Sequence, residues 1–203
     1  MPVDPRDPAA TRTLSRYRCF LYVAPCAYED QLKLGFSRDP LQRFQSFHRR
    51  WFEFFDIDRI ALVETETVRD ARALENRFKR EFAELNAQVP LTVARNAGGE
   101  GEWYRGAQAQ LGAALQSLEG EGYTVHAPAR DWLRDRLMQQ RELLYSWTEA
   151  MLTVDELEQR AGPTSGQWAV RDALDAFRAF AIPLDEALPA AVLRWYREGG
   201  GQR

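Results

Sequence analysis

Two short runs of alternating side chains, joined by a five-residue polar link, constrain the fold of this chain more than any other feature. Residues 19–25 alternate between two faces, with Tyr22 on one of them, and residues 31–37 alternate again, with Lys33 opposite their leucines. Alternation with a period of two is typical of β-strands, and so short a link favours a hairpin. We therefore expect an antiparallel pair that presents Tyr22 and Lys33 in one region of a sheet.

A basic helix is expected directly after the hairpin. Ser37 or Asp39 is placed to cap it, and Pro40 suits its first turn, where the missing N–H costs little. Arg43 and Arg50 are seven residues apart, so one continuous helix would align them along one stripe. The other basic side chains of this stretch are Lys33, Arg38, His48 and Arg49.

The following residues predict a small α+β unit. Residues 59–65 are rich in branched apolar side chains and predict a third strand. Residues 67–85 predict an amphipathic helix that carries Glu75 beside its buried stripe. The glycine-rich residues 94–106 predict a loop, and residues 123–127 a short strand. The expected architecture is α+β: a small three-stranded, mainly antiparallel sheet flanked by helices, plus a C-terminal all-helical domain.

The chain divides near residue 128, where the pattern becomes helical throughout. We predict a flexible lead-in over residues 1–16, a mixed domain over 17–127 and a helical accessory domain over 128–203. Two interpretations of the accessory domain remain open, a helix-turn-helix and a plain bundle. The segment carries 10 basic and 12 acidic residues, which disfavours DNA and favours the bundle. Its tryptophans are candidates for core or partner contacts: Trp132, Trp147, Trp168 and Trp195.

Composition excludes several classes of protein. Two cysteines, Cys19 and Cys26, make no disulfide framework, and two histidines, His48 and His126, make no multi-histidine metal site. No apolar run approaches the ~20 residues that span a bilayer. We expect a soluble cytoplasmic protein that contacts no membrane. Because the net charge is -3, any binding of nucleic acid depends on a local basic patch.

The order of four polar motifs resembles one known family. The sequence FLY ends in Tyr22, KLG spans Lys33 to Gly35, Arg43 follows in the basic helix, and Glu75 lies in the next long helix before the late motif GEWYRG. Over roughly residues 17 to 106 this order resembles the GIY-YIG nuclease superfamily. It is most similar to the branch with a Lys-Ile-Gly-type second motif and a late Glu-Trp-Phe/Tyr motif.

The resemblance implies a metal-dependent endonuclease that hydrolyses phosphodiester bonds in DNA, with RNA as the alternative substrate. It implies that Tyr22 acts as general base, Arg43 holds the phosphate and Glu75 binds a single Mg²⁺ or Mn²⁺ ion. These roles agree with the chemistry, because an arginine fork suits phosphate and Mg²⁺ needs few protein ligands. Lys33 replaces the family's second tyrosine; it suits phosphate contact but not a phenol's proton chemistry.

Residues around this site extend the hypothesis. Arg38, His48, Arg49 and Arg50 are the candidate nucleic-acid-binding residues. Asn96 is a candidate for an asparagine that many members carry late in the domain.

Three simpler interpretations remain beside the nuclease. The fold and its basic helix suit a non-catalytic module that binds nucleic acid or a partner. The arginines suit an acidic protein partner, and the helical domain is itself a candidate for binding protein. Glu75 is also spaced to form an ordinary i,i+4 ion pair with Lys79.

Overall fold

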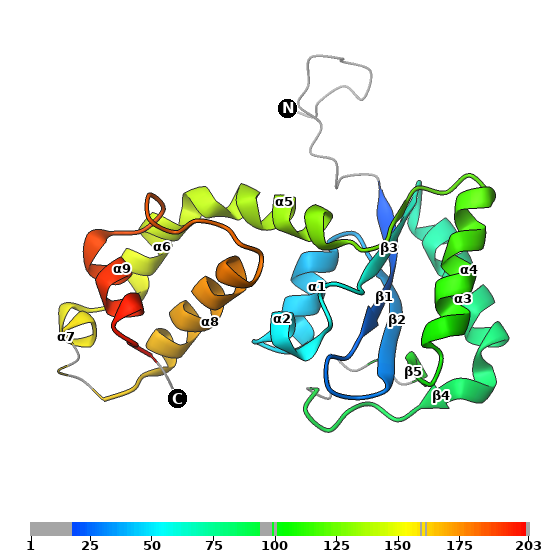
Figure 1. Ribbon diagram of the computed structural model, residues 1–203, viewed down its shortest axis with the longest axis horizontal. Coiled ribbons are helices and arrows are strands. Elements are labelled where there is room, and N and C mark those ends of the chain that lie inside the picture. The colour runs from blue at the N-terminus through cyan, green and yellow to red at the C-terminus, as the bar shows by residue number, and fades with distance from the viewer. Residues whose placement is uncertain (1–17, 94–98, 100, 159, 161, 202–203) are drawn as a thin grey trace, which may run out of the picture.

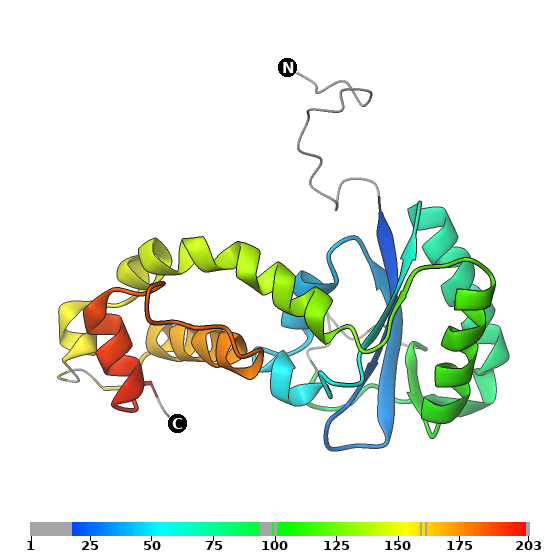
Figure 2. The ribbon, with the colours of Figure 1, turned by 45° about the horizontal axis from the view of Figure 1, so that its top comes forward.

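The computed structural model describes residues 18–93, 99, 101–158, 160 and 162–201. A sheet with helices on both faces occupies one half of the molecule, and further helices form the other half (Figure 1, Figure 2). Residues 1–16 and Asn96 lie outside the described residues, so the predictions made for them stay predictions.

The sheet is antiparallel at every pairing of its six strands, which run in the order β4-β5-β2-β1-β3-β6. The predicted hairpin is its centre, because β1 pairs with β2 on one side and β3 on the other. The strands are β1 Cys19–Pro25, β2 Gln31–Ser37, β3 Ala61–Thr65, β4 Asn86–Ala87, β5 Trp103–Arg105 and β6 Val125–His126.

The α+β class was predicted, but the sheet is larger than the three strands expected. The sequence assigned residues 94–106 to a loop, yet Trp103–Arg105 forms β5 against the edge of β2. Strands of two or three residues, such as β4 and β5, are too short to show a period of two. Their conformation comes from pairing with a neighbour that lies far away in the sequence.

Both faces of the sheet are buried, each in a separate hydrophobic core. Leu21 and Val23 of β1 pack with α3 and α4 on one face, whereas Phe20 and Tyr22 point into the other core with α1 and α2. Figure 1 shows these helix pairs on opposite sides of the strands. The helices are α1 Pro40–Phe47, α2 Trp51–Phe54, α3 Val68–Glu81 and α4 Gln108–Gly120, with the 3-10 turn η1 at Ala83–Leu85.

The basic helix is shorter than predicted. Asp39 caps α1 by accepting a hydrogen bond from the Gln42 backbone N–H at 3.1 Å, but the helix ends at Phe47 because His48 is extended. Arg50 therefore lies outside α1, and the prediction that Arg43 and Arg50 share one helical stripe is wrong. Beyond the end of α1, the His48 ring stacks on Phe54 of α2, with ring centres 5.4 Å apart.

The C-terminal helices share the core that covers the α1 face of the sheet, so the two halves are packed together. After residue 129 the chain forms α5, a 3-10 turn and α6. A capping box at Thr153 begins α7, which has only four residues, short for the first helix of a helix-turn-helix. The elements are α5 Arg130–Gln140, η2 Arg141–Leu143, α6 Leu144–Met151, α7 Val154–Leu157, α8 Ser165–Ala179 and α9 Ala190–Arg197.

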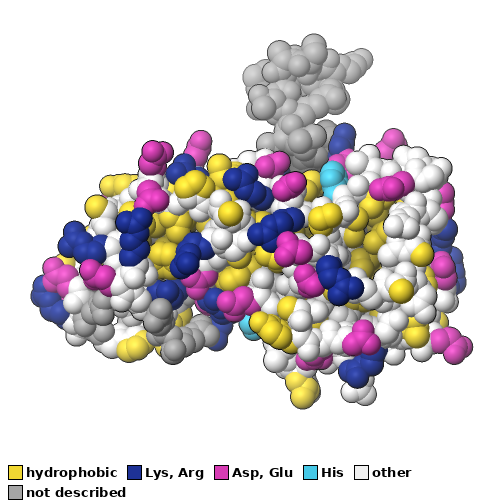
Figure 3. Space-filling view, viewed as in Figure 1, with side chains coloured by type: hydrophobic (Ala, Val, Ile, Leu, Met, Phe, Trp, Pro, Cys, Tyr) yellow, Lys and Arg dark blue, Asp and Glu magenta, His cyan; other side chains and the backbone are white. Residues whose placement is uncertain are grey.

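The apolar and charged character of the molecule bears on whether it contacts a membrane or nucleic acid. Within the described residues, no helix combines the length and apolar character needed to cross a bilayer. On the face shown in Figure 3, basic and acidic side chains are interspersed over both halves. A nucleic-acid site on this face would have to depend on a few residues and not on a broad basic surface.

Candidate active site

The hairpin register brings Tyr22 and Lys33 to the same face of the sheet. Tyr22 lies opposite Gly35 and Lys33 opposite Ala24, so all four residues share that face. A methyl group on Gly35 would lie 2.5 Å from the Tyr22 hydroxyl oxygen. The glycine of the KLG motif is therefore required because the phenol ring lies flat against the β2 backbone.

Arg43 approaches the tyrosine from α1. Its guanidinium donates a hydrogen bond to the Tyr22 phenol oxygen and lies over the Phe47 ring, 4.3 Å from the ring centre. Arg43 is half-buried, whereas Tyr22 is only 1% exposed. Burial raises the pKa of the Tyr22 phenol well above its usual value, and the Arg43 charge opposes that rise only in part.

Lys33 is fully buried but keeps an anionic partner. Its ammonium lies 2.5 Å from Glu102 Oε2 and 5.3 Å from the centre of the Trp103 ring. Burial lowers the pKa of Lys33 to about 8, despite the opposing effect of Glu102. For Glu102, whose side chain is 22% exposed, two nearby ammonium groups outweigh burial, and its pKa is lowered.

Glu75 joins this group through Lys79. The Lys79 ammonium lies 3.3 Å from Glu75 Oε1 and 3.1 Å from Glu102 Oε1, so it bridges the two carboxylates. Burial raises the pKa of Glu75, and the charge of Glu102 adds to that rise. The i,i+4 pair between Glu75 and Lys79 thus forms, but within a larger chain of charges that ends at Lys33.

Four elements, β1, β2, α1 and α3, and the residue just before β5 therefore contribute to one polar cluster, composed of Tyr22, Lys33, Arg43, Glu75, Lys79 and Glu102. Four of these residues, Tyr22, Lys33, Arg43 and Glu75, were predicted from the sequence as catalytic, whereas the way Lys79 and Glu102 connect them was not. The sequence did single out Glu102, as the first residue of the Glu-Trp-Tyr motif. Because β5 pairs with β2 so that Trp103 lies opposite Lys33, Glu102 comes to lie beside Lys33. The only sequence feature that pointed to Lys79 was its i,i+4 spacing from Glu75, and that spacing is common on solvated helices.

The part of the chain that carries this cluster also matches a known domain family. Residues 19–119 match the T5orf172 domain. That domain is found in GIY-YIG-like and nuclease-associated proteins, so the match indicates a nuclease-like or DNA-binding module. No curated protein and no solved structure was found to match the chain.

The match ends within α4, so it includes all six residues of the cluster and none of α5 to α9. Assignment to the GIY-YIG branch itself stays a prediction. The role of the helices beyond the T5orf172 match is likewise a prediction.

The carboxylate oxygens of Glu75 are the type of ligand atom that Mg²⁺ prefers. Within the described part of the chain, no three or more His, Cys, Asp or Glu side chains are grouped to hold an ion. Mg²⁺ is nonetheless often bound by one or two carboxylates, with water and substrate phosphate completing its shell. Glu75 and Glu102 provide such oxygens, and Lys79 would have to move aside because its ammonium bridges them.

The four predicted nucleic-acid-binding residues are not gathered at this cluster. Arg38 is exposed and lines a separate small cavity beside Trp132. The Nδ1 atom of His48 accepts a hydrogen bond from the Arg50 backbone N–H at 3.1 Å. Arg49 is exposed, and its Nε lies 3.8 Å from Asp172 in α8. A direct role for these residues in binding nucleic acid stays a prediction.

Arg50 has partners within the chain. Its guanidinium lies 2.7 Å from Asp172 and 2.8 Å from Asp175, both in α8, and 2.5 Å from Glu53. Its side chain is 24% exposed, so these charges are partly shielded from water. Arg50 therefore ties the region that matches the T5orf172 domain to the helical half.

Replacing Arg50 by alanine should lower the free energy of unfolding by about 2 kcal/mol, because it leaves two partly buried carboxylates without their closest cation. For a chain of this size, that corresponds to a fall in melting temperature of about 4–8 °C. The matched control is Arg49→Ala, which removes a 60% exposed arginine from the same segment and should cost less than about 0.5 kcal/mol. Equal losses in the two variants would contradict the proposed tie.

Proposed function

We propose that this protein is a metal-dependent endonuclease that hydrolyses phosphodiester bonds in DNA, with RNA as the alternative substrate. The observation that carries the proposal is the approach of Arg43 to the buried Tyr22, beside a cluster that includes Glu75. The T5orf172 match supports the same class of activity. Two free cysteines support the cytoplasm as the proposed location.

Each polar residue has a proposed role in this reaction. The half-buried guanidinium of Arg43 would bind two oxygens of the scissile phosphate as a fork. The Tyr22 phenol oxygen would accept a proton from the attacking water, and Glu75 would hold the metal ion. That ion would supply charge stabilisation at the phosphate and the leaving oxygen. Lys33 would keep the cluster positive enough to accept a polyanion, with Glu102 and Lys79 fixing its position.

The direct test is cleavage of supercoiled plasmid and branched DNA duplexes with Mg²⁺ or Mn²⁺. We expect nicking that stops when EDTA is added, measured as conversion of supercoiled to open-circular plasmid. A parallel RNA substrate decides between the two nucleic acids. The absence of nicking across these substrates with either metal would reject the catalytic proposal.

The pH profile should identify the base. Because the pKa of Tyr22 is raised, its phenol is protonated near neutral pH, and the reactive phenolate increases about tenfold per pH unit. The logarithm of the cleavage rate should therefore rise with pH without a plateau near 8, and Tyr22→Phe should abolish most of the activity. A plateau above about pH 8, retained in Tyr22→Phe, would point to neutral Lys33, whose pKa is about 8.

A second candidate is a nucleic-acid-binding module that does not cleave. The observation in its favour is that Lys33 and Lys79 already neutralise the Glu102 and Glu75 carboxylates. It predicts binding whose affinity falls steeply with salt, as phosphate contacts require, and no product in any nicking assay. Binding measured at two salt concentrations beside the nicking assay separates the two candidates.

A further inference from the structure

Lys79 contacts the same two carboxylate oxygens that a metal ion at the proposed site would use. Its ammonium lies 3.3 Å from Glu75 Oε1 and 3.1 Å from Glu102 Oε1. Mg²⁺ binds carboxylate oxygens at about 2.0–2.1 Å, which is closer than this ammonium approaches them. Because a divalent cation and an ammonium repel each other strongly at such short range, the two compete for these oxygens.

The second oxygen of Glu102 is held by other partners. The Lys33 ammonium lies 2.5 Å from Glu102 Oε2 and donates a longer hydrogen bond, 3.4 Å, to the Gly99 carbonyl. A methyl group on Gly99 would overlap Glu102 Oε2, so the backbone of this glycine covers the oxygen. The side chain of Lys33 is fully buried, so this contact persists when Lys79 moves. Glu102 therefore keeps its position and presents Oε1 for exchange between cations.

Lys79 is the cation of the cluster that is free to exchange with water. Its side chain is 29% exposed, compared with 0% for Lys33 and 7% for Glu75. Among the residues that the structure describes, its ion-pair partners are Glu75 and Glu102. The flexible stem of Lys79 starts one turn along α3 from Glu75, so it can turn toward water without any change in the helix. Partly exposed ion pairs are weak, so a metal ion can displace the ammonium.

We propose that Lys79 is a built-in counter-ion that competes with the divalent metal ion for Glu75 and Glu102, and so lowers the metal affinity of the site. The inference rests on the metal site of the proposed function, but not on cleavage. Without metal, the Lys79 ammonium neutralises the two acids that it bridges. Metal binding requires this ammonium to leave, which raises the metal concentration at which the site fills.

The test measures the affinity for Mn²⁺ alone, without DNA. Lys79→Met removes the competing charge and keeps an unbranched side chain, so it should lower the dissociation constant for Mn²⁺ about tenfold. Lys79→Arg keeps a cation that can pair with both carboxylates, so its affinity should stay within about threefold of the wild type. The electron paramagnetic resonance signal of free Mn²⁺ gives the affinities on the full chain, and far-ultraviolet circular dichroism checks the fold.

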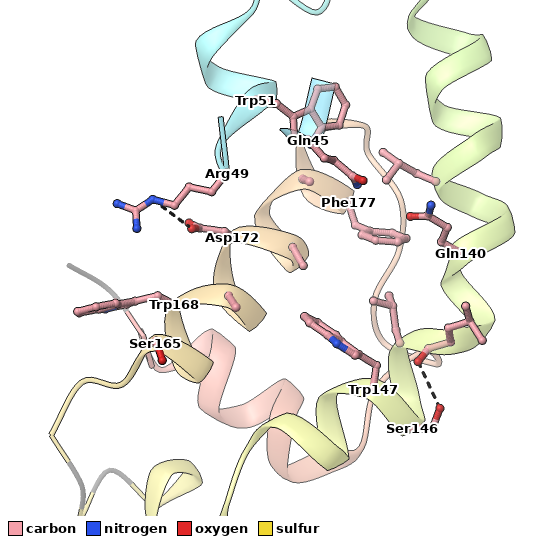
Figure 4. A pocket seen from close by; sticks show the side chains of 16 residues that line it. Gln45, Arg49, Trp51, Gln140, Ser146, Trp147, Ser165, Trp168, Asp172 and Phe177 are labelled. Carbon is pink, nitrogen blue, oxygen red and sulfur yellow. Dashed lines mark hydrogen bonds and ion pairs between the residues drawn. The ribbon is translucent and has the colours of Figure 1, made fainter. Parts of the chain in front are cut away.

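Two controls separate competition at this site from a general effect of charge. Arg49 also lies near a carboxylate, Asp172, but this pair faces a groove lined by α6 and α8, outside the cluster (Figure 4). Arg49→Met changes the net charge by the same amount and should leave the Mn²⁺ affinity within about twofold, because salt screens distant charges. Adding Glu75→Gln to Lys79→Met should remove the gain in affinity, since one of the two contested carboxylates is then absent.

The outcomes for competition and for cleavage are read separately. A Lys79→Met affinity no higher than that of the wild type would overturn the proposal, and so would an equal gain in Arg49→Met or a gain that survives Glu75→Gln. If the wild type nicks DNA and Lys79→Met shows no gain, only this inference fails. If Lys79→Met shows the gain and the wild type nicks nothing, the competition stands and the proposed cleavage fails.

Discussion

Arg43→Ala should slow DNA cleavage by roughly 100- to 1,000-fold, the usual cost of removing one preorganised contact to a developing charge. The guanidinium is held by the Phe47 ring and by its hydrogen bond to Tyr22, so it needs little reorganisation to bind a phosphate. Its loss would remove the proposed phosphate fork and also the positive charge that favours the Tyr22 phenolate. The measurement is the single-turnover rate of nicking at saturating protein.

Arg43→Lys separates the effect of the fork from that of the charge, and Arg69→Ala is the surface control. Arg43→Lys keeps the charge but loses the planar pair of donors, so it should recover only part of the rate. Arg69→Ala removes an exposed arginine of α3 and should leave the rate unchanged within about twofold. Glu75→Gln should reduce metal-dependent nicking at least as strongly as Arg43→Ala. Wild-type rates in Arg43→Ala and Glu75→Gln would reject the assignment of this cluster as the active site.

Glu102→Gln should lower the free energy of unfolding at pH 7 by about 3 kcal/mol, because it leaves the fully buried Lys33 ammonium without its anion. Removing that anion lowers the pKa of Lys33 further below its value in the unfolded chain. The unfolded state then binds more protons than the folded state, so the stability of the variant rises with pH. The deficit relative to wild type should therefore be smaller at about pH 9 than at pH 7.

A second substitution should restore the stability. Lys33→Met in the Glu102→Gln background removes the unpaired charge and keeps an apolar chain of similar length, so most of the loss should be recovered. Glu119→Gln, at an exposed position of α4, is the matched control and should cost less than about 0.5 kcal/mol. Urea unfolding of the wild type, Glu102→Gln, Lys33→Met and the double variant gives the coupling directly. Additive losses in the double variant would show that the ion pair does not determine the stability.

Local patterns in the sequence predicted the centre of this fold. Alternation over residues 19–37 predicted the hairpin, because strand side chains face opposite ways at every step. The same rule placed Tyr22 and Lys33 on one region of the sheet, as the register confirms. The start of α1 also followed from its capping candidates, of which Asp39 is the one that caps the helix, since caps act within three residues.

Features that depend on distant neighbours were not predictable in this way. The strand Trp103–Arg105 exists because β2 offers an unpaired edge, and nothing in three residues encodes that partner. The end of α1 at Phe47 separates Arg50 from Arg43 and directs it to Asp172 and Asp175, which lie over a hundred residues later in the chain. One continuous basic stripe was therefore the wrong expectation.

The sequence by itself determined the central hairpin, the start of α1 and the residue types of the candidate site, since these arise from periodicity, capping and motif order over short distances. Only the tertiary structure decided which charged side chains of the site pair with one another. Pairing of β5 with β2 brings Glu102 to Lys33, and the packing of α3 adds Lys79 and Glu75. Burial then sets which charges persist, because desolvation and ion pairing depend on every element that surrounds a side chain.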